Sequence, residues 1–374
     1  MKNESIRLLV SGKHAFPEII QCIEHAKISV EINMFIWRDD KIGNRMAEAV
    51  LTAADRGAKV SISVDRYGVV LEKCEEGKRS FFHKQMTLSE KTKAWLLEKL
   101  YPENSRPGNV KDEYTETYKR VMTHPNITVS ADKFKADHSK YYIIDDEILF
   151  VGGINIEDKE NGCDISGRVY GDYMVKLCSE KYVCAFRKKL ATGRNTLDEL
   201  FFGVNLKNPE RRFEMEQLYL NLINEAETEL HITMAYFSPL ATFTQAILAA
   251  HRRGVHVSII ISERANFQND SNRRTAYTLL KASSGEIDVY FCKKMLHTKL
   301  VMNEQYISLG STNITKKAFS QLSELNLFVQ NRDTAFKHTL QESILEDMRC
   351  SRRIRSFHEI TYNRLFAFLE SFMV

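Results

Sequence analysis

Long apolar runs are missing from this chain of 374 residues. No stretch approaches the roughly 18 or more consecutive apolar residues that a membrane-spanning helix needs. The first residues, 1–9 (MKNESIRLL), also lack the apolar segment of a signal peptide. We therefore expect a cytoplasmic protein that is soluble or peripheral to the membrane.

A disulfide framework is lacking as well. The seven cysteines are odd in number and include no Cys-x-x-Cys pair, which suits a reducing compartment. Cys292 stands close before His297, but no set of partners with zinc spacing accompanies it. We expect no bound metal and no cofactor.

The chain also has little excess charge of one sign. Its 53 basic and 49 acidic side chains give a net charge of +4, which is compatible with an anionic lipid surface or with nucleic acid. It falls short of a dedicated DNA-binding domain. With 43% hydrophobic residues the chain can form a sizeable core, so disorder is excluded, and its length predicts two or three domains or one large α/β body.

What the chain does have is one short pattern in two copies, His-x-Lys followed by Gly-Gly/Ser-x-Asn. The first copy comprises His138, Lys140, Gly152, Gly153 and Asn155, and the second comprises His297, Lys299, Gly310, Ser311 and Asn313. An isolated His-x-Lys is usually a solvated strand end. Two copies with nearly the same spacing, and with the same residue types between them, indicate a functional site.

The residues around each copy predict its local geometry. Apolar, strand-like runs follow each His-x-Lys at 141–144 and 300–302, and second runs at 148–151 and 306–309 lead to the glycines. Side chains on a strand share a face at every second residue, so each His and Lys point the same way. The glycine turn returns the Asn amide toward them. Each copy therefore predicts a hairpin with a polar tip, and both tips can address one ligand.

A longer internal repeat surrounds the motifs. Residues 26–34 and 226–234 alternate like half-buried strands, and 56–63 is echoed by 253–260. Between them lie Ala-rich helical segments, 44–55 and 242–252, each ended by a glycine as C-cap.

This strand–helix–strand unit predicts an α/β fold of two halves, each a mixed sheet flanked by helices, related by a pseudo-twofold axis. The first half would span 1–200 and the second 201–374, with residues 190–212 as the link.

Two segments fall outside the repeat. The charged insertion 71–137 carries Phe81, Phe82 and Trp95 on segments that are predicted to be helical, and Pro102 and Pro107 with Gly108 break it. It is either a helical excursion packed on the body, or a cover over the active site or a membrane contact.

Near the carboxyl end, the apolar run 365–369 is preceded by five arginines, namely Arg349, Arg352, Arg353, Arg355 and Arg364. These residues predict a basic C-terminal helix that either contacts an anionic interface or packs on the second half.

The paired motifs resemble the signature of the phospholipase D superfamily, His-x-Lys-x4-Asp followed by Gly-Gly/Ser-x-Asn, which most members carry twice. Within it the chain looks most like the bacterial cardiolipin synthases, in the branch without amino-terminal transmembrane helices. The resemblance covers nearly the whole chain, is weakest at 71–137, and is carried by 31–40 (EINMFIWRDD), 53–65 (AADRGAKVSISVD), 151–156 (VGGINI), 236–239 (YFSP) and 309–314 (LGSTNI). One departure is Glu304, where the second signature has Asp; the first copy keeps Asp145. These acids lie at the far end of the strand from the histidine, so we expect them to be structural.

The residue types suit attack on a phosphodiester, whose negative charge repels nucleophiles. Two positive charges and two amides can surround its nonbridging oxygens, and a hydroxyl can add to them; these groups belong to Lys140, Lys299, Asn155, Asn313 and Ser311. Histidine can act near neutral pH either as a neutral nucleophile or as a charged acid.

The resemblance implies a covalent phosphohistidine, with His138 as nucleophile and His297 as acid and then base, although the reverse assignment stays open. It also places at Asp172 and Glu324 the acids that orient the histidines, unless these are solvated strand-end acids.

The resemblance favours a phosphatidyltransferase of the cardiolipin synthase type. It implies phospholipid substrates such as phosphatidylglycerol and an anionic membrane surface as partners. Three alternatives are a phospholipase D hydrolase, a nuclease or phosphodiesterase on the same scaffold, and a noncatalytic lipid-binding protein. Because both motifs lie in one chain, no second subunit is needed for the active site.

Overall fold

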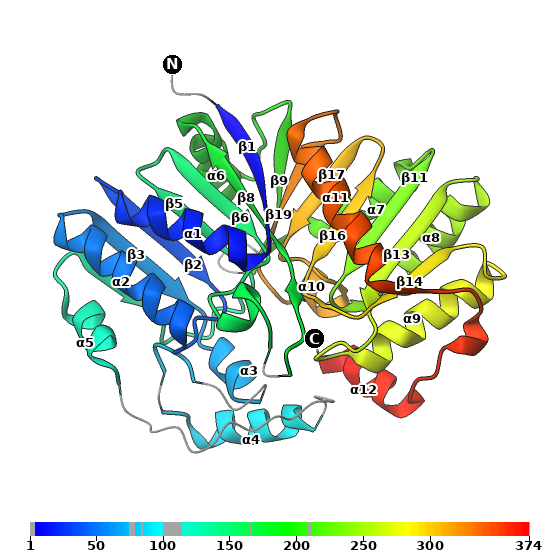
Figure 1. Cartoon of the computed structure of the whole chain (residues 1–374), viewed down its shortest axis with the longest axis horizontal. Helices are drawn as coiled ribbons and strands as arrows, with labels where there is room; N and C mark the ends of the chain where they lie inside the picture. The colour runs from blue at the N-terminus through cyan, green and yellow to red at the C-terminus, as the bar shows by residue number, and fades with distance from the viewer. Residues whose placement is uncertain are drawn as a thin grey trace. The chain divides into compact units, whose positions relative to one another are not determined.

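The computed structural model describes residues 4–74, 79–83, 85–99, 114–164, 166–207 and 211–373. The chain forms two compact units, Met1–Asn195 and Thr196–Val374, and each is described by itself below (Figure 1).

The first unit is built on a mixed sheet of seven described strands in the order β1-β8-β6-β5-β2-β3-β4. Strands β2, β3 and β4 run parallel, whereas β5, β6, β8 and β1 join through antiparallel pairs. Their bounds are β1 (Ser5–Val10), β2 (Ser29–Met34), β3 (Lys59–Val64), β4 (Ile127–Ser130), β5 (Tyr141–Ile144), β6 (Ile148–Gly152) and β8 (Tyr173–Cys178).

Helices cover both faces of this sheet. On one face, α1 (Ser11–Glu24), α2 (Lys41–Asp55) and α5 (Glu116–Thr123) enclose a core that includes Ile32, Ile62 and Tyr142. The neighbouring residue Tyr141 points to the opposite face, where its ring lies 5.0 Å from that of Phe186 on α6 (Glu180–Thr192). The sheet is therefore the middle layer of three.

The second unit has a mixed sheet of nine described strands in the order β10-β9-β19-β17-β16-β11-β13-β14-β20. Its parallel strands are β11, β13 and β14. The strand bounds are β9 (Leu200–Leu206), β10 (Arg212–Phe213), β11 (Glu229–Met234), β13 (His256–Ser262), β14 (Asp288–Cys292), β16 (Lys299–Asn303), β17 (Tyr306–Gly310), β19 (Glu324–Gln330) and β20 (Ser351–Ile354). The helices are α7 (Met215–Glu225), α8 (Ala241–Arg252), α9 (Asn269–Ala282), α10 (Lys316–Ser320), α11 (Ala335–Arg349) and α12 (Arg364–Met373).

The two sheets share one topology. The seven strands of the first unit match, in the same order, β9-β19-β17-β16-β11-β13-β14 of the second. Helices α2 and α8 end two residues before Gly57 and Gly254, whose φ angles of 99° and 91° are the left-handed conformation predicted for a C-cap. The prediction of two α/β halves with mixed sheets and flanking helices is confirmed.

The insertion differs in part from its prediction. It begins within α3 (Gly68–Cys74) and contains α4 (Leu88–Glu98), on which Trp95 lies as expected. Its last part does not fall outside the repeat, because β4 holds the same place in the first sheet as β14 in the second. Phe81 and Phe82 are buried but not helical, because the Phe81 N–H donates to the Trp37 carbonyl and both rings pack on the Trp37 indole. The breakers Pro102, Pro107 and Gly108 lie outside the described residues.

The carboxyl end forms the predicted helix, α12, but this helix is not basic. Of the five arginines, only Arg364 belongs to α12; Arg349 ends α11, and Arg352 and Arg353 lie on β20. Among the described residues, no helix is long and apolar enough to span a bilayer.

Candidate functional site

The first motif lies on a hairpin in the middle of its sheet. His138 and Lys140 immediately precede β5, and Asn155 follows β6, which pairs antiparallel with β5 as predicted. All three side chains are buried, with exposed fractions of 8%, 0% and 2%. The Lys140 ammonium donates to the His138 carbonyl at 2.5 Å, which holds its positive charge beside the histidine.

An aromatic ring accompanies this pair. The Phe35 ring centre lies 4.8 Å from that of His138, nearly perpendicular to it, and 5.2 Å from the Lys140 Nζ. A cation over a ring face is attracted by the ring quadrupole. Phe35 therefore restrains both members of the first His-x-Lys.

Three polar side chains hold the segment that carries His138. The Asp65 carboxylate accepts the N–H groups of Tyr67, Lys135 and Asp137 at 2.8, 3.2 and 2.7 Å. Asp137 accepts the Ser139 N–H at 3.0 Å, and the Asn33 amide donates to both Asp137 and Ser139. Burial raises the pKa of Asp65 and of Asp137.

The motif search missed Asn33, Asp65 and Asp137. The signal that identifies the first two is their place at the carboxyl ends of the parallel strands β2 and β3, where polar groups of α/β sheets gather around ligands.

A carboxylate packs against the glycine turn of the first motif. The Gly153 N–H donates to the Tyr173 carbonyl at 3.1 Å, and the Tyr173 N–H donates to Asp172 Oδ1 at 2.8 Å. A Cβ at position 153 would lie only 2.3 Å from Asp172 Oδ2. The first copy therefore has glycine because the acid occupies the space that a side chain would need.

The second motif follows the same plan. His297 precedes β16, Lys299 begins it, and Asn313 follows β17; their exposed fractions are 7%, 1% and 3%. The Lys299 ammonium donates to the His297 carbonyl, and the Tyr236 ring lies 6.3 Å from that of His297. The Tyr236 N–H donates to Asn313 Oδ1 at 3.2 Å, so Tyr236 links the two ends of the motif.

Ser311 differs from its prediction. Its hydroxyl donates to the Glu324 carboxylate, and the Leu325 N–H donates to the hydroxyl oxygen at 3.0 Å. The hydroxyl was expected to face phosphate oxygens, but its proton is already directed at Glu324. Asp172 and Glu324 are 3% and 1% exposed, so the interpretation as solvated strand-end acids is wrong for both.

The acids that end the two signatures, Asp145 and Glu304, have a structural role, as expected: both bind backbone N–H groups. Asp145 accepts the N–H groups of Lys27, Ile28 and Ser29 at 2.7 to 2.9 Å. Glu304 accepts those of residues 227–229 at 3.0 to 3.4 Å. Burial opposes ionisation of both acids, but the backbone donors outweigh it and hold their pKa below the usual values. The longer Glu304 thus replaces Asp at the start of β11.

Buried charges lie in the segment that follows Asn155 in the chain. Arg38 Nε lies 2.5 Å from Glu157 Oε2, and both side chains are almost fully buried; Lys159 Nζ lies 3.4 Å from the same oxygen. Nearby, Asp158 accepts the Ile42 N–H at 2.8 Å at the start of α2, and Asp40 accepts the Asp158 N–H at 2.7 Å. The segment after Asn155 is therefore fixed to the beginning of α2.

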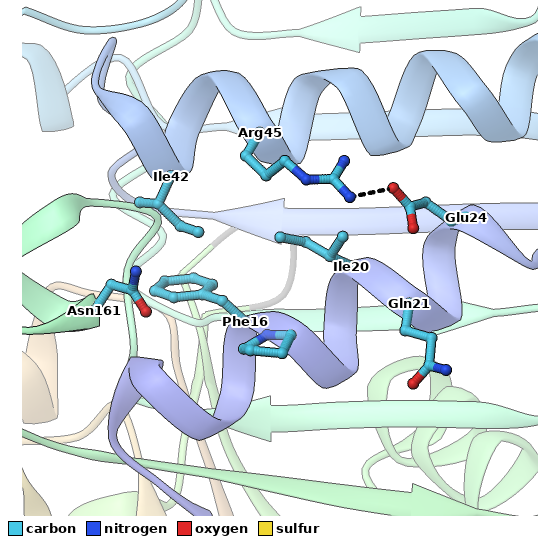
Figure 2. A pocket seen from close by; sticks show the side chains of 8 residues that line it. Phe16, Ile20, Gln21, Glu24, Ile42, Arg45 and Asn161 are labelled. Carbon is cyan, nitrogen blue, oxygen red and sulfur yellow. Dashed lines mark hydrogen bonds and ion pairs between the residues drawn. The ribbon is translucent and has the colours of Figure 1, made fainter.

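A separate hollow of about 340 Å³ lies on the surface between α1 and α2. Figure 2 shows Phe16, Ile20 and Ile42 along it, with the Arg45–Glu24 ion pair at one side. None of its lining residues belongs to either motif, so we do not assign the chemistry to it.

Comparisons with known proteins agree with this arrangement. The profile of the family described as "Cardiolipin synthase, PLD-like domain" matches residues 19–166 and 219–347. Cardiolipin synthase B of Salmonella typhi is 25% identical over 92% of this chain and 80% of its own length. Cardiolipin synthase 2 of Staphylococcus epidermidis is 22% identical over 98% of this chain and 73% of its own length.

Solved structures share the fold over nearly the whole chain. Phosphatidylserine synthase of Haemophilus influenzae is 14% identical and superposes with a TM-score of 0.71, covering 97% of this chain and 91% of that one. Polyphosphate kinase of Porphyromonas gingivalis reaches a TM-score of 0.55 over 96% of this chain and 50% of that one, at 13% identity. With a family profile that covers most of the chain and both motifs in place, the protein belongs to the family of cardiolipin synthase, phospholipase D-like domains.

Proposed function

We propose that this protein is a phosphatidyltransferase of the cardiolipin synthase type, which moves a phosphatidyl group from one phospholipid to an alcohol group of another. The observation that carries the proposal is that both motifs retain a buried His, Lys and Asn, and that in both the lysine ammonium donates to the histidine carbonyl. Membership of the cardiolipin synthase family supports lipid as the substrate class. Phosphatidylglycerol is the substrate that we propose, at an anionic membrane surface.

The first chemical step forms a covalent phosphohistidine. The lone pair of a His138 ring nitrogen attacks phosphorus, the bond from phosphorus to the leaving oxygen breaks, and His297 gives its proton to that oxygen. Lys140 and Lys299, with the amides of Asn155 and Asn313, neutralise the nonbridging oxygens. Loss of one such donor typically lowers the rate about 100- to 1000-fold.

The second step transfers the group. The hydroxyl oxygen of the acceptor lipid attacks the phosphorus, His297 takes the hydroxyl proton, and the phosphorus–nitrogen bond breaks to release His138. Water in place of the lipid alcohol would give phosphatidic acid, so the acceptor alone separates transfer from hydrolysis. Asp172 and Glu324 act here as positioning acids for the histidines, and Ser311 acts through Glu324.

Product analysis tests this proposal. The protein is incubated with vesicles of phosphatidylglycerol and phosphatidylethanolamine, and lipids are identified by mass spectrometry. We expect cardiolipin from the wild type and from His338→Ala, a control at an exposed histidine, but none from His138→Ala. Phosphatidic acid alone would mean hydrolysis. No change in either lipid would contradict a lipid substrate, and the same samples would then be given single-stranded DNA.

A second measurement assigns the two histidines. The substrate is a phosphatidyl ester of an acidic phenol, whose phenolate leaves without being protonated. His297→Ala should therefore still release the phenol in a burst and keep an acid-labile phosphatidyl group bound to the protein. His138→Ala should give no burst. The opposite pattern would establish the reverse assignment.

A further inference from the structure

Helix α12 turns its apolar side outward. The side chains of Leu365, Phe366, Phe368 and Leu369 are 63%, 44%, 53% and 37% exposed, whereas Ala367 and Glu370 are 0% and 3% exposed. A surface helix usually buries its apolar stripe against the protein and exposes its polar side. Here this order is reversed, and four large apolar side chains lie next to one another on one helix.

Hydrogen bonds fix this orientation. Figure 1 shows α12, in red, packed along α9. The Ser271 N–H donates to Glu370 Oε2 at 2.7 Å, and the Ser271 hydroxyl donates to the Ala367 carbonyl at 3.0 Å. The Asn363 N–H before the helix donates to Asp270 Oδ1 at 2.7 Å. Because these contacts hold the polar side at the start of α9, the helix cannot roll its apolar side inward without breaking them.

Two exposed basic residues accompany α12. Arg364 begins α12 and is exposed, and α12 also packs against α10, whose Lys316 is exposed. Two acids contact this part of the chain: Glu370 is buried and accepts the Ser271 N–H, and the half-buried Asp270 accepts the Asn363 N–H. α10 begins three residues after Asn313, so this surface lies close in the chain to the second motif.

We infer that α12 is an interfacial anchor, whose exposed side inserts into the headgroup and acyl boundary of an anionic phospholipid leaflet. At ten residues the helix is about 15 Å long, too short to span a bilayer but suited to lie in its plane. The apolar side chains leave water, and Arg364 and Lys316 meet lipid phosphates. The inference deepens the proposed function, because it supplies the membrane contact of a lipid-modifying enzyme.

Vesicle flotation tests the anchor on the full-length protein. The wild type and His138→Ala should both float with vesicles of phosphatidylcholine and phosphatidylglycerol, and much less with phosphatidylcholine alone. Leu365→Asp should bind about tenfold or more weakly, since an exposed apolar contact is lost and a negative charge is added. The matched control is Leu345→Asp, at a leucine that is 52% exposed on α11, and its binding should not change.

Further measurements separate the anchor from the chemistry. In detergent micelles that contain the substrate, Leu365→Asp should transfer at the wild-type rate, and circular dichroism should show an unchanged fold. If Leu365→Asp misfolds, Phe368→Ser replaces it. If Leu365→Asp and Leu345→Asp bind vesicles equally well, the anchor is overturned even if the wild type transfers lipid. If the wild type floats with vesicles but transfers no lipid, only the proposed function is overturned. A wild-type dimer that Leu365→Asp dissociates, without vesicle binding, would make this surface a contact between two copies and would also overturn the anchor.

Discussion

At the scale of single residues, Asp145 and Glu304 show how one task is done with two side-chain lengths. Each carboxylate accepts hydrogen bonds from backbone N–H groups at the start of a strand, β2 for Asp145 and β11 for Glu304. That strand is the first of the βαβ unit in its sheet. Hydrogen bonds to an ionised group are stronger than those between neutral groups. The acids thus stabilise the sheet from which the motif hairpin extends.

The lowered pKa of Asp145 predicts a pH-dependent stability. A carboxyl group whose pKa is lower in the folded state contributes stability above its unfolded pKa of about 4, and this contribution disappears as the pH falls through the folded value. Asp145→Asn should lower the free energy of unfolding at pH 7 by about 1 kcal/mol, with solvent screening taken into account. Urea unfolding of both proteins between neutral and acidic pH checks this.

The difference between wild type and Asp145→Asn should shrink below about pH 4. The other carboxyl groups are common to both proteins and cancel in the comparison. A difference that stays constant to the lowest pH at which the fold survives would contradict the assignment to Asp145.

Residue identity at the motifs was predictable, but some residue roles were not. His138, Lys140, Asn155 and their counterparts follow from a repeated pattern, because chemistry needs those residue types. The positions of Asp172 and Ser311 relative to their turns depend on the register between β6 and β8 and between β17 and β19. Register is set by packing across the whole sheet, so the hydrogen bond from Ser311 to Glu324 could not be predicted from the sequence.

At the scale of elements, the segment after the first motif depends on a buried ion pair. Glu157 lies between Arg38 and Lys159, and the exposed fractions of all three side chains are below 5%. Removing one partner of a buried pair leaves an uncompensated charge and typically costs about 3–5 kcal/mol. Glu157→Gln should therefore destabilise the protein strongly and lower activity, because Asn155 stands two residues away.

A matched control is available on the same unit. The Glu18 carboxylate forms ion pairs with Lys176 and Arg7 at a partly exposed site. An ion pair at such a site contributes only about 0–1 kcal/mol to stability. Glu18→Gln should leave thermal unfolding and activity nearly unchanged. Similar losses in the two variants would show that the buried pair behaves like a surface pair.

The strands and helices of the repeat were largely predictable, whereas the insertion was not. Alternation and helical spacing identify β2, α2 and β3 and their partners β11, α8 and β13. The half-buried pattern expected for 226–234 is wrong, however, because β11 and β13 are buried on both faces after their first residue. Phe81 and Phe82 carry no such periodicity. Their burial follows from the Trp37 ring and from a backbone hydrogen bond, and both depend on contacts between segments that are distant in the chain.

At the scale of the whole molecule, one chain carries both motifs, and this predicts the outcome of a mixing experiment. His138→Ala and His297→Ala are each expected to be inactive in lipid transfer. Because each of these chains lacks one histidine, a mixture should stay inactive if a single chain forms a complete site. Recovery of cardiolipin formation on mixing, measured against each variant alone, would show that motifs from two chains combine.

The common strand order has a genetic consequence. In each sheet the motif hairpin, β5–β6 or β16–β17, occupies the middle of the strand order rather than an edge. A deletion within either hairpin would divide the sheet, and its carrier would lose the protein altogether. Missense changes at the polar tips leave the strand pairing of the hairpin intact, so they should remove activity at normal protein abundance, and such alleles are the ones suited to substrate-trapping screens.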